Sequence, residues 1–137
     1  MYAIVQTRNG YYVLKDKVFI LDGMQLRFLY DISQNVVPDL DMVVLYFKSL
    51  KKFQELCALN LVGVRPQRVP STGEKRIVVS DQDHVLYYGI KASVFKPYIT
   101  EKGRTLLDDV RTDTLFRQCL EDMDKKMAET LLTRGSS

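Results

Sequence analysis

The single histidine of the chain, His84, stands beside two aspartates in the order Asp81-Gln82-Asp83-His84. A histidine oriented by a carboxylate can act as a general acid or base near neutral pH. The same side chains could hold a metal ion, but three groups in one turn without a fourth ligand make a poor site. Aspartate favours turns through local hydrogen bonds, which explains the cluster more simply. We therefore assign neither a catalytic residue nor a metal ligand.

Other catalytic patterns are missing from the sequence. It contains no glycine-rich phosphate loop, no GxSxG and no HExxH. A metal-dependent nuclease needs clustered carboxylates, and the apolar run after Asp39 and Asp41 lacks the acid that this arrangement requires. Cys57 and Cys119 form no CxxC and have no nearby histidine, so we expect two buried free thiols, which suit a reducing compartment. The sequence does not settle whether the protein is an enzyme but favours one that is not, and it indicates no cofactor.

Positive charge is concentrated in the middle of the chain. Residues 48–105 hold eleven basic and five acidic residues, whereas the whole chain has a net charge of only +3. Basic side chains surround an irregular stretch over 61–75, and clustered Lys and Arg bind phosphates by releasing condensed counterions. Tyr87 and Tyr88 point to opposite faces of a predicted strand, so one ring could stack on a base. The candidate residues are Lys48, Lys51, Lys52, Arg65, Arg68, Lys75, Arg76, Tyr87 and Tyr88.

This pattern predicts a non-catalytic binding protein that contacts nucleic acid through the segment 48–76. An ordinary solvated basic surface explains the same residues, and nothing in the spacing chooses between DNA and RNA. The alternative is a protein–protein interaction, or a regulatory or inhibitory accessory subunit, acting through the C-terminal helix or the 61–75 loop. An apolar stripe on that helix either packs on the sheet or pairs in part with another chain, which could be a second copy. The stripe consists of Phe116, Leu120, Met123, Met127 and Leu131.

The N-terminal half predicts strands followed by a helix. Asn9-Gly10 favours a hairpin between 2–7 and 11–15, with Thr7 opposite Tyr12 and Val5 opposite Leu14. Residues 18–21 form a third strand. The segment 23–34 alternates as a strand would, but Asp22 and Gln25 form a capping box and Leu21 and Leu26 a hydrophobic staple, which favour a helix. The continuous apolar run 42–47 predicts a central strand covered on both faces.

The rest of the chain predicts two further helical regions and a second hairpin. A helix runs from a cap at Ser49 to about 59, with Leu50, Phe53 and Leu56/Cys57 on its buried stripe. Residues 75–80 and 85–99 form an antiparallel pair about 81–84. Thr100 begins the C-terminal helical region, which breaks near Thr112-Asp113, and residues 135–137 fray.

Length and composition complete the prediction. The 137 residues are 46% hydrophobic and 27% charged, which is typical of a folded protein. We expect a single α+β domain over 1–134, with a mainly antiparallel sheet covered by two or three helices that include a long amphipathic C-terminal helix. The longest apolar run, 42–47, falls far short of the roughly 20 residues that span a bilayer. The N-terminus lacks the pattern of a signal peptide, so we expect a cytoplasmic protein with no membrane partner.

Overall fold

The computed structural model describes residues 1–66 and 95–135, and within them the chain has the predicted α+β fold. A three-stranded antiparallel sheet has the order β1-β2-β3, and a two-stranded antiparallel sheet pairs β4 with β5. The strands are β1 (Tyr2–Thr7), β2 (Gly10–Lys15), β3 (Val18–Asp22), β4 (Val62–Pro66) and β5 (Phe95–Ile99). The helices are α1 (Gly23–Ser33), the 3₁₀ helix η1 (Leu40–Leu45), α2 (Leu50–Ala58), α3 (Glu101–Val110) and α4 (Thr114–Gly135).

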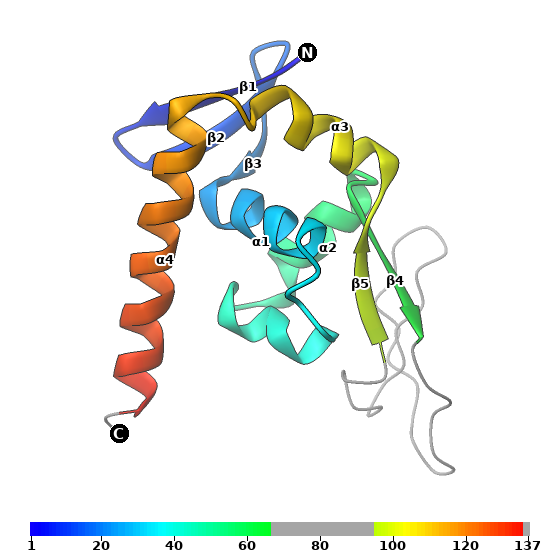
Figure 1. Ribbon diagram of the computed structural model, residues 1–137, viewed down its shortest axis with the longest axis vertical. Coiled ribbons are helices and arrows are strands. Elements are labelled where there is room, and N and C mark those ends of the chain that lie inside the picture. Colours follow the sequence, from blue (N-terminus) through cyan, green and yellow to red (C-terminus); the bar gives the residue numbers. More distant parts are fainter. Residues whose placement is uncertain (67–94, 136–137) are drawn as a thin grey trace.

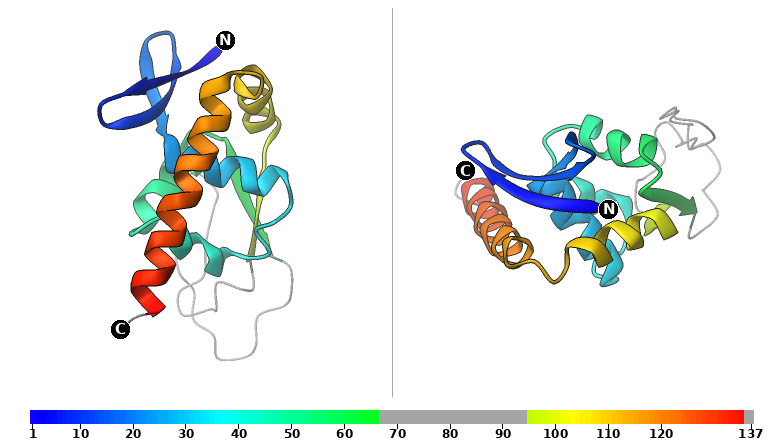
Figure 2. Two further views of the ribbon diagram at one scale, coloured as in Figure 1. Left: turned by 60° about the vertical axis from the view of Figure 1, so that its left-hand side comes forward. Right: turned by 90° about the horizontal axis from the view of Figure 1, so that it is seen from above.

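Helix α1 lies at the centre of the fold (Figure 1). The β1–β3 sheet covers one of its ends, α4 runs along one side, and β4 and β5 lie on the opposite side (Figures 1 and 2). Leu26, Phe28 and Leu29 on α1 are completely buried. Helix α1 is therefore covered on both sides. It holds α4 in a fixed position relative to β4 and β5.

The start of α1 confirms the helix prediction. The Asp22 side chain accepts a hydrogen bond from the Gln25 backbone N–H, and the Gln25 side chain accepts one from the Asp22 N–H, each at 2.9 Å. Leu21 and Leu26, the predicted staple pair, are both buried. These interactions satisfy two N–H groups that a helix start leaves without partners, which decides the segment in favour of helix.

The first hairpin forms where predicted, but its register and its buried face differ from the prediction. Val5 pairs with Tyr12, not with Leu14, and Thr7 pairs with Gly10, not with Tyr12. Slipping by two residues leaves the same side chains on each face, but the other face is the one buried. The buried side chains are Tyr2, Ile4, Tyr11 and Val13.

The turn geometry explains the slip. The two residues between β1 and β2 are Arg8 and Asn9, and positive φ occurs at Gly10 (127°). The two-residue turn with positive φ at both central positions lies in the next connection, at Asp16 (53°) and Lys17 (68°). This is the condition that a type I′ turn requires, met by residues that the sequence did not single out.

The strand predicted over 42–47 is wrong, because this run lies in η1 and the turn after it. The backbone N–H groups of Tyr46 and Phe47 both donate to the Val43 carbonyl at 3.0 Å. Val44 is 54% exposed between the buried Val43 and the partly buried Leu45, which a central strand would not allow. The rings of Tyr46 and Phe47 pack edge-to-face on Phe28 of α1, with centroids 4.8 and 5.3 Å away. A short apolar run is compatible with either state, and packing on Phe28 decides it.

Helix α2 agrees with its prediction except on one side chain. Phe53, Leu56 and Cys57 are buried as expected, but Leu50 is 45% exposed and does not belong to the buried stripe. Ser49 occupies the N-cap position without making a side-chain capping bond.

The predicted irregular stretch 61–75 is wrong over its first part, which is strand β4. β4 pairs with β5 in the register Val62↔Ile99, so the strand that ends at Ile99 has a partner other than the predicted 75–80. The rest of the predicted loop and the hairpin about 81–84, with Asp81, Asp83 and His84, lie outside the described residues.

The C-terminal helices confirm the predicted break. The Thr100 hydroxyl accepts from the Gly103 N–H at 3.1 Å at the start of α3, and Asp113 accepts from the Leu115 N–H at 2.9 Å at the start of α4. Phe116 and Met123 are buried on α4, with Leu120 and Met127 partly buried against the core. Among the described residues, no helix is both long enough and apolar enough to cross a membrane.

These late helices are bonded to the first strands. The Tyr2 backbone N–H donates to Asp109 of α3 at 3.0 Å, and the Tyr11 hydroxyl donates to Asp122 of α4 at 2.5 Å. Burial and the Asp122 hydrogen bond raise the pKa of Tyr11 to about 12. The buried face of the first sheet is therefore closed by α3 and α4.

Candidate functional site

The predicted basic residues that the structure describes do not gather on one surface. Lys52 lies 3.2 Å from Asp22 and 3.8 Å from Glu55, measured from its ammonium nitrogen to their carboxylate oxygens. Partial burial is the largest single effect on the pKa of Lys52 and lowers it, but the charge and hydrogen bond of Asp22 together with the charge of Glu55 outweigh burial, so the pKa is raised. Lys52 thus joins α2 to the capped start of α1. Because two carboxylates already lie beside its ammonium group, Lys52 is a weak candidate for binding an anionic ligand.

The remaining candidates are divided between other places. Lys48 and Lys51 are exposed, and Lys48 lines a groove of about 670 Å³ between η1 and α4 that Lys126 also lines. Arg65 lies on β4. The other five candidates, Arg68, Lys75, Arg76, Tyr87 and Tyr88, lie outside the described residues.

Arg65 is held by an aromatic ring of the neighbouring strand. Its guanidinium lies over the Tyr98 ring of β5, 4.3 Å from the ring centroid. Gly63 pairs with Tyr98 across the sheet, and a Cβ at Gly63 would lie 2.3 Å from the ring carbon Cζ. The absence of a side chain at Gly63 therefore makes the space in which the ring lies against β4. The resulting stack fixes the Arg65 guanidinium at the surface, at an energy of about 0.5–1 kcal/mol for an exposed cation–π pair.

Two more cations face the same hollow as Arg65. A pocket of about 260 Å³ is lined by Arg65 of β4, Lys96 of β5 and Arg104 of α3, together with Ser33, Asn35 and Tyr98. We call this the three-cation pocket. Lys96 donates to the Asn35 side-chain oxygen at 3.0 Å. No carboxylate belongs to the part of its wall that residues 1–66 and 95–135 provide.

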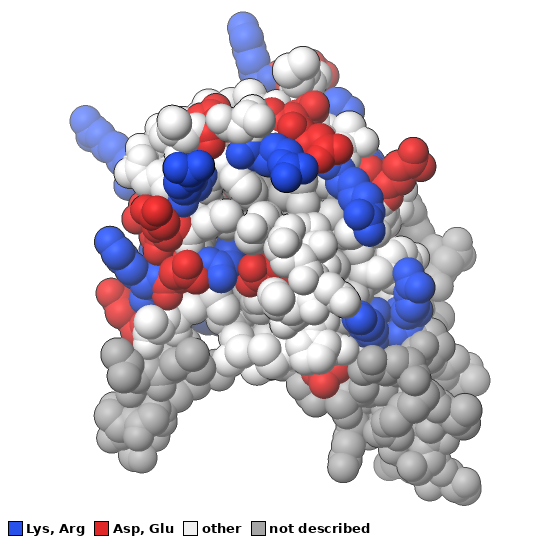
Figure 3. Space-filling view, in the orientation of Figure 1, with Lys and Arg blue, Asp and Glu red and all other residues white. Residues whose placement is uncertain are grey.

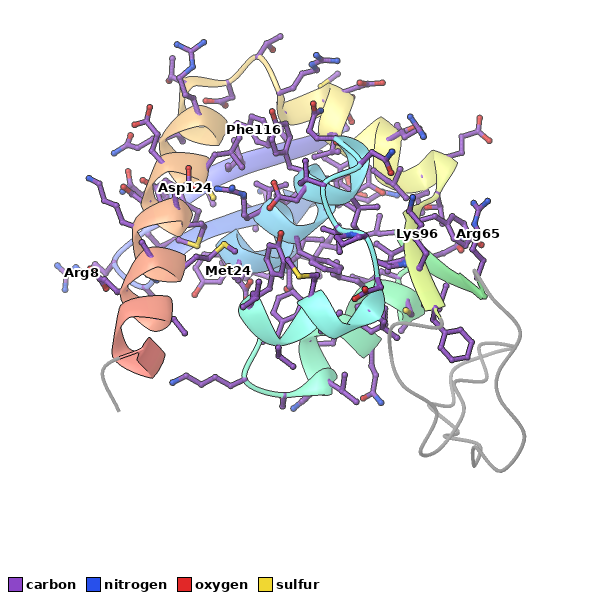
Figure 4. All side chains as sticks on the ribbon, turned by 60° about the horizontal axis from the view of Figure 1, so that its bottom comes forward. Arg8, Met24, Arg65, Lys96, Phe116 and Asp124 are labelled. Atoms are coloured by element: carbon purple, nitrogen blue, oxygen red, sulfur yellow. The ribbon has the colours of Figure 1, made fainter. Side chains whose placement is uncertain are left out.

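The figures show this concentration of charge. Arg65 and Lys96 lie close together on the side of β4 and β5, whereas Arg8 lies at the far side, beyond α4 (Figure 4). In the space-filling view, blue side chains gather over β4 and β5 at the right, while red and blue alternate over α4 (Figure 3). On this face of the molecule, the blue side chains over β4 and β5 are thus not interleaved with red ones as those over α4 are (Figure 3).

A second pocket adjoins the first. It measures about 430 Å³ and shares Ser33 and Arg104 with the three-cation pocket. Its wall includes the half-buried ring of Tyr30, which packs edge-to-face on Phe116 with centroids 5.5 Å apart. We call it the Tyr30 pocket. The exposed pair Asp108–Arg111, 3.6 Å apart, also lines it.

Sequence reasoning missed Lys96, Tyr98 and Arg104. Lys96 and Tyr98 alternate with Phe95, Pro97 and Ile99, which are buried, so the strand pattern was present in the sequence. The sequence did not identify β4 as a partner of 95–99, and pairing with β4 is what brings these residues to Arg65.

A buried polar network lies on the other flank of α1. Asp31 is 5% exposed, accepts from the Arg27 guanidinium at 3.0 Å and accepts from the Tyr46 hydroxyl at 2.5 Å. Arg27 also donates to the Leu120 carbonyl and pairs with Asp124. Burial, reinforced by the Asp31 hydrogen bond, raises the pKa of Tyr46. Since every group has a partner, the network joins α1, the turn after η1 and α4, and it offers no free acid or base.

The cysteines and acids of the described residues also fit structural roles. Cys119 is buried with its sulfur 3.7 Å from the Gly23 carbonyl oxygen, and burial raises its pKa to about 12, so the reactive thiolate is suppressed. Cys57 is buried and forms no disulfide. Within the described ranges, no group of His, Cys, Asp and Glu is arranged to hold a metal ion.

Comparisons of the chain with protein-family models, with curated proteins and with solved structures give no match.

Proposed function

We propose that this protein binds nucleic acid through the basic surface formed by β4, β5 and the start of α3. The observation that carries the proposal is the three-cation pocket, where Arg65, Lys96 and Arg104 from three separate elements line one hollow. Like charges repel, so three cations gathered without a carboxylate in the described wall favour an anionic ligand at this place.

The arrangement suits phosphate chemistry. Arg104 and Arg65 present planar guanidinium groups that can donate to phosphate oxygens in pairs, while Lys96 adds a compact charge. The Tyr98 stack already orders Arg65, so less side-chain freedom is lost when an anion binds. This proposal keeps Arg65 from the predicted segment 48–76 and extends it to residues beyond that segment.

Fluorescence anisotropy tests the proposal. Labelled single-stranded and duplex DNA and RNA are titrated at low and at physiological salt with the wild type and with the triple variant Arg65→Gln, Lys96→Gln, Arg104→Gln. We expect the variant to bind at least about tenfold more weakly, and the slope of log K against log salt to fall by about 2, because three phosphate contacts are removed.

A matched control separates a site from bulk charge. Arg8→Gln, Lys17→Gln and Lys125→Gln change the net charge equally at exposed positions away from both pockets. The control should keep wild-type affinity within about twofold. Equal losses in the two triple variants would mean that binding is generic electrostatics, and the proposed surface would then be wrong.

A protein interaction at α4 is the second candidate, because of the groove between η1 and α4. Met24, Val44, Leu45 and Phe47 line this groove, and Val44 is 54% exposed. If it binds a second copy or a partner subunit, Val44→Asp should abolish association seen by light scattering. Val36→Asp, at a position of similar exposure (56%) outside the groove, should not.

A further inference from the structure

We infer that the bound nucleic acid is a single strand, and that the three-cation pocket and the Tyr30 pocket receive consecutive nucleotides with the phosphate between them on Arg104. This inference rests on the proposed nucleic-acid binding and adds the class of ligand and its placement.

The two pockets form one continuous path. Ser33 and Arg104 belong to the walls of both, and Arg104 is exposed at the junction. A guanidinium at a junction can contact the phosphate that links two nucleotides while each base enters the pocket on its own side. The Ser33 hydroxyl donates to the Tyr30 carbonyl at 2.5 Å and accepts from the Gln34 side-chain amide at 3.4 Å, which leaves one lone pair of its oxygen to accept from a base or sugar.

The three-cation pocket offers a flat surface and polar groups to its nucleotide. The Arg65 guanidinium, held over Tyr98, presents a plane on which a base can stack. Asn35 lies just past the end of α1 with φ of 61°, and its backbone N–H donates to Ile32 at 3.0 Å, so its position is set by the helix end. Its amide oxygen already accepts from Lys96, which leaves the amide N–H₂ to donate to a base edge.

The Tyr30 pocket suits a base better than a phosphate. Tyr30 offers an aromatic wall, braced edge-on by Phe116, and base–aromatic stacking tolerates any base. Asp108 and Arg111 line the same pocket as an ion pair 3.6 Å apart, so their charges largely offset each other, and the described wall beyond Arg104 offers a phosphate no unpaired cation. The aromatic wall and the paired charges therefore favour the phosphate at Arg104 and the base beyond it.

A duplex does not fit this arrangement. Its bases are stacked and paired inside the helix, so only its backbone could reach the cations, and both pockets would remain empty. A single strand can turn its bases outward, which is the usual basis for stacking recognition. The two pockets thus favour single strands at equal phosphate charge.

The test uses three labelled probes: ten-nucleotide oligothymidine, ten-nucleotide oligouridine and a ten-base-pair DNA duplex. Binding of each probe is measured by fluorescence anisotropy at physiological salt. Tyr30→Leu removes the ring while keeping an apolar side chain, and Tyr30→Phe is its matched control. We expect Tyr30→Leu to weaken single-strand binding by about fivefold or more, as loss of one stacked base does, with no change in the salt slope. Tyr30→Phe should bind as the wild type does. A preference between the two oligonucleotides would show whether the site favours deoxyribose with the thymine methyl group or ribose without it.

Arg104→Gln provides the complementary signature. It should lower the single-strand salt slope by about 0.7, because one phosphate contact is lost. If Tyr30→Leu lowers the melting temperature, Ser33→Ala replaces it, since this change deletes one hydroxyl at the junction and should weaken single-strand binding severalfold.

The outcomes separate the inference from the proposed function. Equal affinity for duplex and single strand, with Tyr30→Leu and Ser33→Ala both neutral and the cation variants still weak, would overturn the inference and leave nucleic-acid binding in place. Failure to bind any of the three probes would overturn both. The inference and the proposed function would both be supported by two results. The protein would prefer single strands, and the salt slope would be unchanged in Tyr30→Leu but lowered in Arg104→Gln.

Discussion

Replacing Gly63 by alanine tests the close contact between β4 and the Tyr98 ring, over which Arg65 lies in the candidate site. The new Cβ would lie 2.3, 2.4 and 2.6 Å from three atoms of Tyr98, whereas ordinary contacts begin at 3.4 Å. The ring must therefore retreat by about 1 Å or leave β4. Either movement carries Arg65 away from its place, because its guanidinium rests over that ring.

The expected sign follows from two opposing effects. Alanine in a strand is normally better than glycine by about 0.5–1 kcal/mol, and the φ of Gly63 is not positive, so this gain applies. Forcing an extra methyl into an occupied space costs about 1–3 kcal/mol, and loss of the cation–π contact adds about 0.5–1 kcal/mol. We expect the variant to be less stable by about 1–2 kcal/mol.

A double-mutant cycle isolates the contact. Urea unfolding followed by circular dichroism gives the stability of the wild type, Gly63→Ala, Tyr98→Ala and the double variant. In the Tyr98→Ala background the space is empty, so Gly63→Ala should be neutral or stabilising there. The coupling between the positions should be about 2 kcal/mol. An equal effect of Gly63→Ala in both backgrounds would refute the idea that the missing side chain at Gly63 makes room for the Tyr98 ring.

Three further results are expected. Gly103→Ala should destabilise by about 1–2 kcal/mol in urea unfolding despite the helix propensity of alanine, because its Cβ would lie 2.4 Å from the Leu61 carbonyl oxygen; the exposed neighbour change Lys102→Ala should be neutral. Tyr11 ionises near 10 when unfolded but at about 12 when folded, so only the unfolded state loses this proton between those values. The urea midpoint should thus fall as pH rises from 10 to 12, not below 10, and Tyr11→Phe should reduce that fall. Alkylation at pH 8 with peptide mass mapping should leave Cys119 unmodified until denaturant is added, since it is buried with its thiol pKa raised to about 12; native-state modification would contradict this.

Sequence reasoning succeeded where local chemistry decides the structure. The capping box of Asp22 and Gln25 and the break at Asp113 each depend on residues within one turn of each other, and both formed as predicted. It failed where tertiary packing decides. The run 42–47 satisfies a strand pattern, but Phe28 provides the aromatic surface that draws Tyr46 and Phe47 into a 3₁₀ helix and a turn.

The candidate site shows the same division. Arg65 was identified from local charge alone. Its partners Lys96 and Arg104 are 31 and 39 positions further on, and only the pairing of β4 with β5 and the start of α3 against Leu61 bring them together. The alternation of buried and exposed residues over 95–99 marked a surface-facing Lys96 and Tyr98, but pattern alone does not say which strand lies alongside.

The contact of the first strand with the last helices has a consequence for synthesis. Tyr2 and Asp109 are 107 positions apart, and Tyr11 and Asp122 are 111 apart. At translation rates of about 5–20 residues per second, the hairpin leaves the ribosome roughly 5–20 s before the helices that close its apolar face. During that interval Tyr2, Ile4, Tyr11 and Val13 lack their cover. The nascent chain therefore keeps this apolar face exposed until α4 emerges, which is the condition under which partly synthesised chains aggregate.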